Sequence, residues 1–303
     1  MMNEMELEKS IKEIKELESS IMALLEAPLQ HTSKVIKDPY EYVKITTEAV
    51  RGVISGFRKS IRYFLDLYKV NYVVVDGIEG SGKTSLLQGT PLTEKYITPL
   101  LENKFTDNND KPIQYHLDKF PNRNTKFGEL FYKYLDMVNI VKNKDLIYLV
   151  MCLCNVMDRL SYTLNRRGKE DIPLLASIID NHMCVLCDRF YMSNILTLPI
   201  DDKWLKDIMY EMYNLERDLY GDHVKVLLRK PLFDIVTGKT VSESQYLDRM
   251  KHTIICRKGE NTFFDEKVEW QLSNFQNVYD HIKDDISEEN EAFYIYTPKT
   301  LYR

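Results

Sequence analysis

The stretch VVVDGIEGSGKTSLL, Val73 to Leu87, joins an apolar segment, a glycine-rich loop and the start of a second apolar pattern. Within it, residues 77–84, GIEGSGKT, match G-x-x-x-x-G-K-[ST] at every position. A loop of this kind lets successive backbone N–H groups converge on phosphate oxygens at the positive end of a helix. The stretch therefore predicts a phosphate-binding loop between a strand and a helix.

Each residue type in the loop suits a phosphate group. The glycines permit backbone conformations that bring N–H groups close to a ligand, and Lys83 can reach the terminal phosphates. The hydroxyl of Thr84 is expected to be a ligand of Mg²⁺. The residues predicted to bind the donor nucleotide are Gly77, Gly80, Ser81, Gly82, Lys83, Thr84 and Ser85. We therefore expect the protein to use ATP and Mg²⁺.

From Val70 onward, short apolar segments alternate with helical patterns. The candidate strands are residues 71–76, 113–117, 183–187, 224–228 and 292–296. Alternation of this kind predicts an α/β fold of three layers, in which helices cover both faces of a five-stranded parallel sheet. We assign residues 70–303 to this P-loop domain and residues 1–69 to an α-helical extension.

The N-terminal extension has its own pattern. Leu7, Ile14 and Ile21 recur every seven residues between charged side chains, which predicts an amphipathic helix. Asp38-Pro39 then offers a cap and a first-turn proline for a second helix. The two helices either pack on their own domain or form a coiled-coil or partner-binding arm.

The composition limits the classes of function. The 303 residues carry a net charge of −5, which argues against a general nucleic-acid-binding protein or a polybasic membrane-binding protein. The N-terminus is charged, and no apolar run has the length of a membrane span. The five cysteines mostly lie in apolar runs without metal-ligand spacing, as expected for buried thiols. We expect a cytoplasmic protein, in the host cytoplasm if it is viral, with no nucleic-acid or membrane partner.

The residues after a second apolar segment indicate which phosphate chemistry is used. This segment, MCVLC at 183–187, is followed by Asp188-Arg189. Hydrolytic ATPases usually place an acidic pair there, whose carboxylate positions the attacking water. An arginine cannot activate water, but it can clamp an anionic substrate. In addition, the N-K-x-D motif of guanine-specific GTPases does not follow an appropriate strand. These features favour transfer to a bound phosphate over hydrolysis.

Four motifs of the sequence can be compared together: DGIEGSGKTS at 76–85, FPNRNTKFGELFYKYL at 120–135, MDRL at 157–160 and DRFYMS at 188–193. Together they resemble the thymidylate kinase family of P-loop nucleoside monophosphate kinases. The second is the most specific, because it is close to F-P-x-R-x-T-x-x-G-x-x-I-x-x-Y-L. The resemblance covers about residues 70–303. It implies a nucleoside monophosphate kinase-like fold and ATP-dependent phosphorylation of a nucleoside monophosphate, with dTMP the favoured acceptor and a homodimer a possible assembly.

The resemblance also implies roles for charged residues. Arg123, Arg159 and Arg189 are expected to form a pocket around the acceptor and transferred phosphates, where the planar guanidinium suits a phosphate better than lysine does. Asp188 is expected to hold Mg²⁺ through water, together with Thr84. These three arginines and Lys83 are the predicted catalytic residues outside the lid.

Three further residues are predicted to contact the acceptor. The resemblance directs Glu79 towards the acceptor sugar and places Phe120 at the substrate. Asn155 stands where the family usually has a phenylalanine that stacks on thymine. Asparagine does not stack comparably, but it can hydrogen-bond the edge of a base. The base pocket therefore differs from the family more than the phosphate-binding residues do.

The family's mobile lid corresponds to about residues 248–265. Where the phosphate loop lacks a basic residue, the lid of a family member supplies one. Gly80 and Ser81 carry no charge, so the lid residue Arg257, or Arg249 in its place, is expected to stabilise charge in the transition state.

Two other functions stay open at this point. A deoxynucleoside kinase of related fold would deprotonate a sugar hydroxyl with a carboxylate at the end of the second strand, where Asp118 is the nearest one. A non-catalytic P-loop scaffold would bind nucleotide and present the N-terminal helices to a partner. Intact Lys83, Thr84 and Asp188 argue against the scaffold.

Overall fold

The computed structural model describes residues 3–30, 38–68, 70–104, 114–138, 141–164, 183–258 and 263–298. The strands are β1 (Tyr72–Asp76), β2 (Gln114–Lys119), β3 (Met183–Asp188), β4 (Val224–Arg229), β5 (Phe233–Asp234), β6 (Lys239–Thr240), β7 (Ile286–Glu289) and β8 (Phe293–Tyr296). The helices are α1 (Glu4–Gln30), α2 (Pro39–Leu67), α3 (Lys83–Leu87), α4 (Pro91–Tyr96), α5 (Thr98–Lys104), α6 (Lys126–Met137), α7 (Lys144–Leu164), α9 (Met192–Thr197), α10 (Lys203–Tyr220), α11 (Glu243–Lys258) and α12 (Phe263–Ile282). Within these ranges, no helix is both long and apolar enough to cross a membrane.

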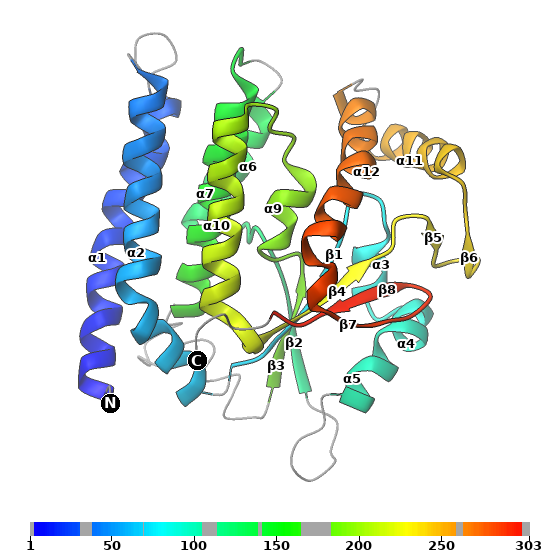
Figure 1. Ribbon diagram of the computed structural model, residues 1–303, viewed down its shortest axis with the longest axis horizontal. Helices are drawn as coiled ribbons and strands as arrows, with labels where there is room; N and C mark the ends of the chain where they lie inside the picture. The colour runs from blue at the N-terminus through cyan, green and yellow to red at the C-terminus, as the bar shows by residue number, and fades with distance from the viewer. Residues whose placement is uncertain are drawn as a thin grey trace.

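The central sheet is mixed but mostly parallel, with strand order β2-β3-β1-β4-β8-β7 (Figure 1). The first four strands run parallel. β8 is antiparallel to β4, and β7 is antiparallel to β8. The α/β fold class is confirmed: the phosphate loop joins the central strand β1 to α3 in a P-loop kinase-like arrangement.

One detail of the predicted sheet is wrong, because the strand at 292–296 is antiparallel and the sheet has a sixth strand. The cause is a tight turn that folds β7 and β8 into a hairpin. The side chain of Asn290 accepts hydrogen bonds from the N–H groups of Ala292 and Phe293, at 2.9 and 2.8 Å. This local turn returns the chain along β4 in the opposite direction.

The strand β1 is buried on both faces, as expected for the middle of a parallel sheet. Tyr72 and Val74 belong to the larger core, which includes buried side chains of α2, α7 and α10. Val73 and Val75 face the smaller core beneath α3, α4 and α5. The alternation follows the two-residue period of a strand. It gives the three layers and fixes the phosphate loop at the carboxyl end of β1.

The N-terminal helices share the larger core with the rest of the chain. Leu7, Ile14 and Ile21 are buried in it. Arg51 of α2 pairs with Glu211 of α10, with Nε and Oε1 2.6 Å apart. Figure 1 shows α1 and α2 side by side along the α7–α10 layer.

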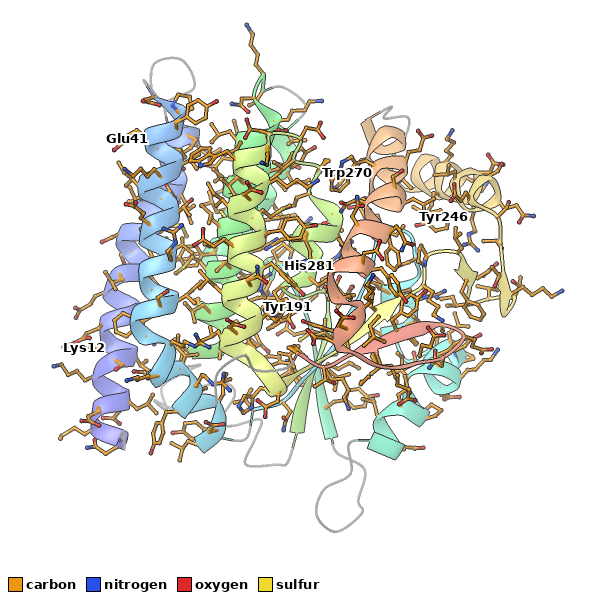
Figure 2. The ribbon with its side chains drawn as sticks, viewed as in Figure 1. Lys12, Glu41, Tyr191, Tyr246, Trp270 and His281 are labelled. Atoms are coloured by element: carbon orange, nitrogen blue, oxygen red, sulfur yellow. The ribbon has the colours of Figure 1, made fainter. Side chains whose placement is uncertain are left out.

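Aromatic side chains join the helices that flank the site. Tyr191, at the start of α9, packs against Tyr213 of α10 with ring centroids 5.6 Å apart. The ring of Tyr213 in turn lies 5.8 Å from that of His281 on α12. Figure 2 labels Tyr191 and His281, the two ends of this series of contacts. These contacts fix α9 and α12 relative to the sheet, next to the phosphate loop.

Candidate active site

The phosphate loop adopts backbone conformations that need glycine. Gly80 and Gly82 have φ angles of 70° and 86°, in the left-handed region. A Cβ atom at Gly80 would lie 1.6 Å from the sulfur of Met250, and one at Gly82 would lie 2.5 Å from Cδ1 of Ile235. Both glycines therefore serve close packing as well as the backbone turn.

The loop closes around the ammonium group of Lys83. Its Nζ donates hydrogen bonds to the carbonyl oxygens of Gly77 at 2.9 Å and Ile78 at 2.6 Å. Burial, with a contribution from the nearby Arg189, lowers the pKa of Lys83 to about 7. A phosphate in the loop would favour the charged form of this lysine.

Thr84 and Asp188 meet where a magnesium ion is expected. The Thr84 hydroxyl donates to Asp188 Oδ2 at 2.9 Å. Asp188 Oδ1 is buried and has no hydrogen-bond partner among the described residues. These are the oxygen ligands that Mg²⁺ prefers. In the described part of the chain, no group of three or more His, Cys, Asp or Glu residues could hold a metal ion by itself, so phosphate oxygens and water would complete the coordination.

A buried carboxylate ties the loop to the turn after β3. Asp76 accepts hydrogen bonds from Gly77 N at 2.8 Å, Ser193 Oγ at 2.6 Å and Phe190 N at 3.2 Å. Arg189 lies between these anchors with a φ angle of 76°, a conformation that few non-glycine residues adopt. Asp76 therefore holds Arg189 beside the phosphate loop.

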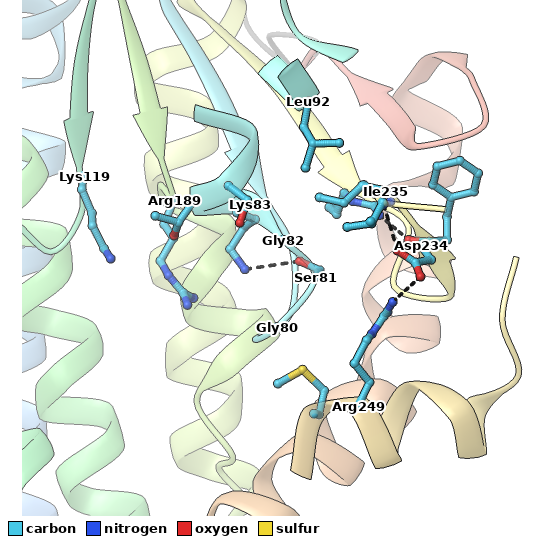
Figure 3. A pocket seen from close by; sticks show the side chains of 16 residues that line it. Gly80, Ser81, Gly82, Lys83, Leu92, Lys119, Arg189, Asp234, Ile235 and Arg249 are labelled. Carbon is cyan, nitrogen blue, oxygen red and sulfur yellow. Dashed lines mark hydrogen bonds and ion pairs between the residues drawn. The ribbon is translucent and has the colours of Figure 1, made fainter. Parts of the chain in front are cut away.

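A cavity of about 350 Å³ opens over the loop (Figure 3). The residues 80–85 form its floor. Its cationic lining residues are Lys83, Lys119, Arg189, Arg229 and Arg249, and Asp234 is its one carboxylate among the described residues. Leu92, Phe233, Ile235 and Val236 form an apolar end. A strongly cationic cavity with an apolar end fits a nucleotide, whose phosphates and base need those two environments.

Arg229 and the β5–β6 hairpin were not among the site features predicted from the sequence. Arg229 is fully buried, and its Nη1 donates to the carbonyl oxygens of Lys230 and Ala292, both at 2.9 Å. Burial lowers its pKa to about 10. Its place at the carboxyl end of a predicted strand next to β1 was the signal that could have identified it.

The lid arginine in the cavity is Arg249. Its Nη1 lies 2.8 Å from Asp234 Oδ2, so the hairpin holds it at the edge of the cavity (Figure 3). The backbone of Arg257 belongs to α11, but its side chain lies outside the described residues. The catalytic role of Arg257 therefore stays a prediction.

Arg123 projects from a rigid turn after β2. Asp158 of α7 accepts a hydrogen bond from Asn122 N at 2.7 Å and shares another with the Thr125 hydroxyl. Burial raises the pKa of Asp158 to about 6. The exposed Arg123 guanidinium lies 3.7 Å from the centre of the Tyr132 ring. The Asp of the MDRL motif thus positions the turn that carries Arg123.

Of the six predicted substrate contacts, only Arg189 lines the cavity; the other five are Glu79, Phe120, Arg123, Asn155 and Arg159. Arg159 is 1% exposed, and Glu216 of α10 holds its Nε at 2.7 Å and its Nη2 at 2.6 Å. Phe120 is buried in the core against Tyr162, with ring centroids 5.0 Å apart. A buried guanidinium is stable only beside a counter-ion. Arg159 therefore pairs with Glu216 and does not line the cavity.

Asn155 and Glu79 have partners from other helices. Asn155 Nδ2 donates to Asn194 Oδ1 of α9 at 2.7 Å, and both side chains are buried. Glu79 Oε1 lies 3.1 Å from Lys267 Nζ of α12. Neither residue lines the cavity, although Gly80, which follows Glu79, does.

Comparison with models of known protein families gives no match. Comparison with curated protein sequences gives none either. Among solved structures, the chain is similar to a thymidylate kinase from Candida albicans, with 15% identity and a TM-score of 0.30 over 75% of this chain and 98% of that one. At this similarity, the assignment of a P-loop kinase-like fold rests on the strand order and the loop geometry above.

Proposed function

We propose that the protein is a nucleoside monophosphate kinase that transfers the terminal phosphoryl group of ATP to an acceptor monophosphate, with dTMP the favoured acceptor. The observation that carries the proposal is the Asp188-Arg189 pair at the end of β3. Asp188 meets Thr84, and Arg189 lines the cavity. A carboxylate for a metal beside a cation for an acceptor phosphate is what transfer between two phosphates requires.

Catalysis in this site would depend on position and charge. A monophosphate acceptor is already ionised, so the reaction needs no strong general base. Lys83 and the loop N–H groups would bind the donor phosphates, while Arg189 and Lys119 would face the acceptor phosphate. When bound between Thr84 and Asp188, Mg²⁺ would supply further neutralisation of the phosphate oxygens.

The turn that carries Arg123 supports an acceptor phosphate site. Gly128 allows α6 to approach this turn, because a Cβ atom there would lie 1.9 Å from the carbonyl oxygen of Asn122. Asp158 fixes the same turn from α7. An arginine on so constrained a turn is preorganised for a bidentate contact with phosphate.

Asn155 supports a thymine or uracil base. Its Oδ1 is buried and lacks a hydrogen-bond partner among the described residues. The N3–H of thymine or uracil is a donor that such an oxygen would accept, whereas N3 of cytosine is itself an acceptor. A buried acceptor without a donor is costly, so a ligand that supplies the donor is favoured.

The second candidate is a deoxynucleoside kinase. It would need Asp118 as the base, yet Asp118 accepts a hydrogen bond from Asn122 Nδ2 at 3.0 Å and does not line the cavity. This geometry favours the monophosphate kinase. The third candidate, a non-catalytic scaffold, would bind ATP without turning it over.

The test is ADP release from ATP and Mg²⁺ with dTMP, dUMP, dCMP, dGMP, UMP or thymidine as the acceptor. We expect the highest kcat/KM with dTMP and no turnover in the Lys83→Ala variant. Turnover of thymidine but not of dTMP would overturn the proposal in favour of the nucleoside kinase. ATP binding without turnover of any acceptor would favour the scaffold.

A further inference from the structure

A second cavity, of about 370 Å³, forms a groove between α2 and α10. Each helix contributes four lining residues at positions i, i+3, i+4 and i+7, beginning at Lys44 in α2 and at Trp204 in α10. This spacing places each set on one face of its helix. The groove shares no lining residue with the cavity over the phosphate loop, and its volume is in the range of ligand-binding pockets.

Two contacts between the helices fix the ends of the groove. At one end Arg51 makes a double contact with Glu211, with Nη2 2.7 Å from Oε2 and Nε 2.6 Å from Oε1. At the other end the ring of Tyr40 packs on that of Trp204, with the centroids 5.3 Å apart. Figure 1 shows α2 and α10 side by side, running in the same direction. The shape of the groove is therefore set by the helix pair.

A buried hydroxyl without a partner lies in the wall of the groove. Thr47 lines the groove and is 2% exposed, and its Oγ1 has no hydrogen-bond partner among the described residues. The neighbouring Thr46 differs, because its hydroxyl donates to Tyr42 O of the preceding helical turn at 2.7 Å. A buried polar group that lacks a partner destabilises the protein, so a ligand that supplies a partner for Thr47 is favoured.

The charges of the groove indicate the kind of ligand. Its lining includes two cationic and three anionic side chains, so its net charge is −1. Since Arg51 is paired with Glu211, the exposed Lys44 stands against the exposed carboxylates of Glu48 and Asp207. The indole of Trp204, which is 39% exposed, lines the same groove. Carboxylates and an indole ring both attract an organic cation.

We propose that this groove binds an aliphatic primary amine in its protonated form. The three N–H donors of the ammonium group would be shared by Thr47 Oγ1 and the carboxylates of Glu48 and Asp207. The aliphatic chain of the ligand would lie along the apolar surfaces of Trp204 and Ile208. A ligand with a single positive charge would neutralise the groove.

The site gives the N-terminal helices a role in ligand binding. Half of its lining residues come from α2, and the other half come from α10. A bound amine would contact both helices and would therefore stabilise the folded chain by mass action. The inference does not rest on the proposed function, because the groove contains no residue of the phosphate-binding cavity.

The test titrates the full chain with n-pentylamine at neutral pH and low ionic strength, by calorimetry and by thermal unfolding. We expect saturable binding at one site, with a raised unfolding temperature. Because n-pentanol has the same chain without the charge, it should bind about tenfold or more weakly. Pentanoate, an anion of the same length, should not bind. Nα-acetyl-lysine methyl amide identifies the source: affinity equal to that of n-pentylamine assigns a lysine side chain, and weaker binding assigns a free amine.

The variant Thr47→Val separates ligand binding from a structural role. Loss of the hydroxyl should weaken binding of n-pentylamine about tenfold. The unfolding temperature without ligand should be unchanged or higher, because the variant removes a buried hydroxyl that has no partner among the described residues. The joint change Glu48→Gln and Asp207→Asn, at two exposed positions, should weaken binding about fivefold or more.

The matched control is Glu129→Gln, which removes an exposed carboxylate of α6 and should bind n-pentylamine as the parent does. Failure of n-pentylamine to bind, or equal binding of n-pentanol, would overturn the inference. Parental affinity in both Thr47→Val and the joint variant would do the same. If Thr47→Val fails to fold, the joint variant at the exposed positions decides the question. None of these results depends on turnover of a nucleotide, so the proposed function is tested separately.

Discussion

The hydroxyl of Thr84 donates a hydrogen bond to Asp188 Oδ2 at 2.9 Å. This hydrogen bond joins the first turn of α3 to the carboxyl end of β3, between two residues that are 104 positions apart in the sequence. Asp188 Oδ1 is buried beside them without a partner in the described part of the chain. The two residues therefore offer a preformed half-site for a divalent cation.

The first prediction concerns this pair. Thr84→Val keeps the shape of the side chain but removes the oxygen, so the Mg²⁺ concentration for half-maximal turnover should rise about tenfold or more. The measurement is turnover against Mg²⁺ concentration at saturating nucleotides. Thr240→Val, on the exposed strand β6, is the matched control and should behave like the parent. If turnover by Thr84→Val depends on the Mg²⁺ concentration as turnover by the parent does, Thr84 is not a ligand of the metal.

The second prediction concerns Arg123. We propose that the guanidinium binds only the acceptor phosphate, so Arg123→Ala should raise the KM for the monophosphate at least tenfold and leave the KM for ATP nearly unchanged. Steady-state kinetics with each substrate varied in turn provide the measurement. Lys126→Ala, an exposed cation three residues further on, controls for the loss of surface charge. Equal KM values for the acceptor in Arg123→Ala and the parent would contradict the assigned role.

The third prediction follows from the proton count at Asp158. Thr125 has one hydroxyl proton, which Asn122 O and Asp158 both face. A protonated Asp158 can donate to Thr125 while Thr125 donates to Asn122, and burial raises the pKa of Asp158 to about 6, so this form is populated below that pH. Asp158→Asn offers an acceptor oxygen and a donor NH₂ group in place of the protonated carboxyl group, but it does not titrate.

The direction in which stability changes with pH follows from the pKa of Asp158, which burial raises from 3.8 to about 6. Its contribution to stability is complete below about pH 4 and is lost as the pH rises through 6. The free energy of unfolding of the parent should therefore fall relative to that of Asp158→Asn by roughly 2–3 kcal/mol between pH 4 and pH 8. Urea denaturation at several pH values measures it, and parallel pH profiles would refute the assignment.

The fourth prediction separates a structural Arg159 from a substrate-binding one. Glu216→Gln leaves a buried guanidinium without its counter-ion, so the free energy of unfolding should fall by roughly 3–5 kcal/mol. Replacing both partners with apolar residues, Arg159→Met and Glu216→Leu, should restore much of it. Chemical denaturation is the measurement. If Glu216→Gln is as stable as the parent but has a raised KM for the acceptor, Arg159 binds the acceptor phosphate and its structural role is refuted.

Local signals made much of the site predictable from sequence. The loop from Gly77 to Thr84 carries its own backbone and charge requirements, and the structure places it between β1 and α3. The cap of α2 was equally local, since Asp38 Oδ1 accepts from Tyr40 N at 2.9 Å and Glu41 N at 3.2 Å. Motifs that act through neighbouring residues can be interpreted without knowledge of the packing.

Features that depend on distant partners were missed. Nothing near Arg159 in the sequence indicates Glu216, because the partner comes from α10. The direction of β8 depends on one turn at Asn290, which a parallel pattern of apolar segments does not reveal. Lys267 resembles any helical surface lysine until α12 packs against the phosphate loop.

We propose that the cavity transfers phosphoryl groups between nucleotides. ADP release from ATP and Mg²⁺, measured with and without dTMP in the parent and in Lys83→Ala, tests this transfer. We expect ADP release that depends on dTMP, is matched by an equal amount of dTDP and disappears in Lys83→Ala. Release of ADP and free phosphate at the same rate without dTMP would contradict it, because the site would then hydrolyse ATP.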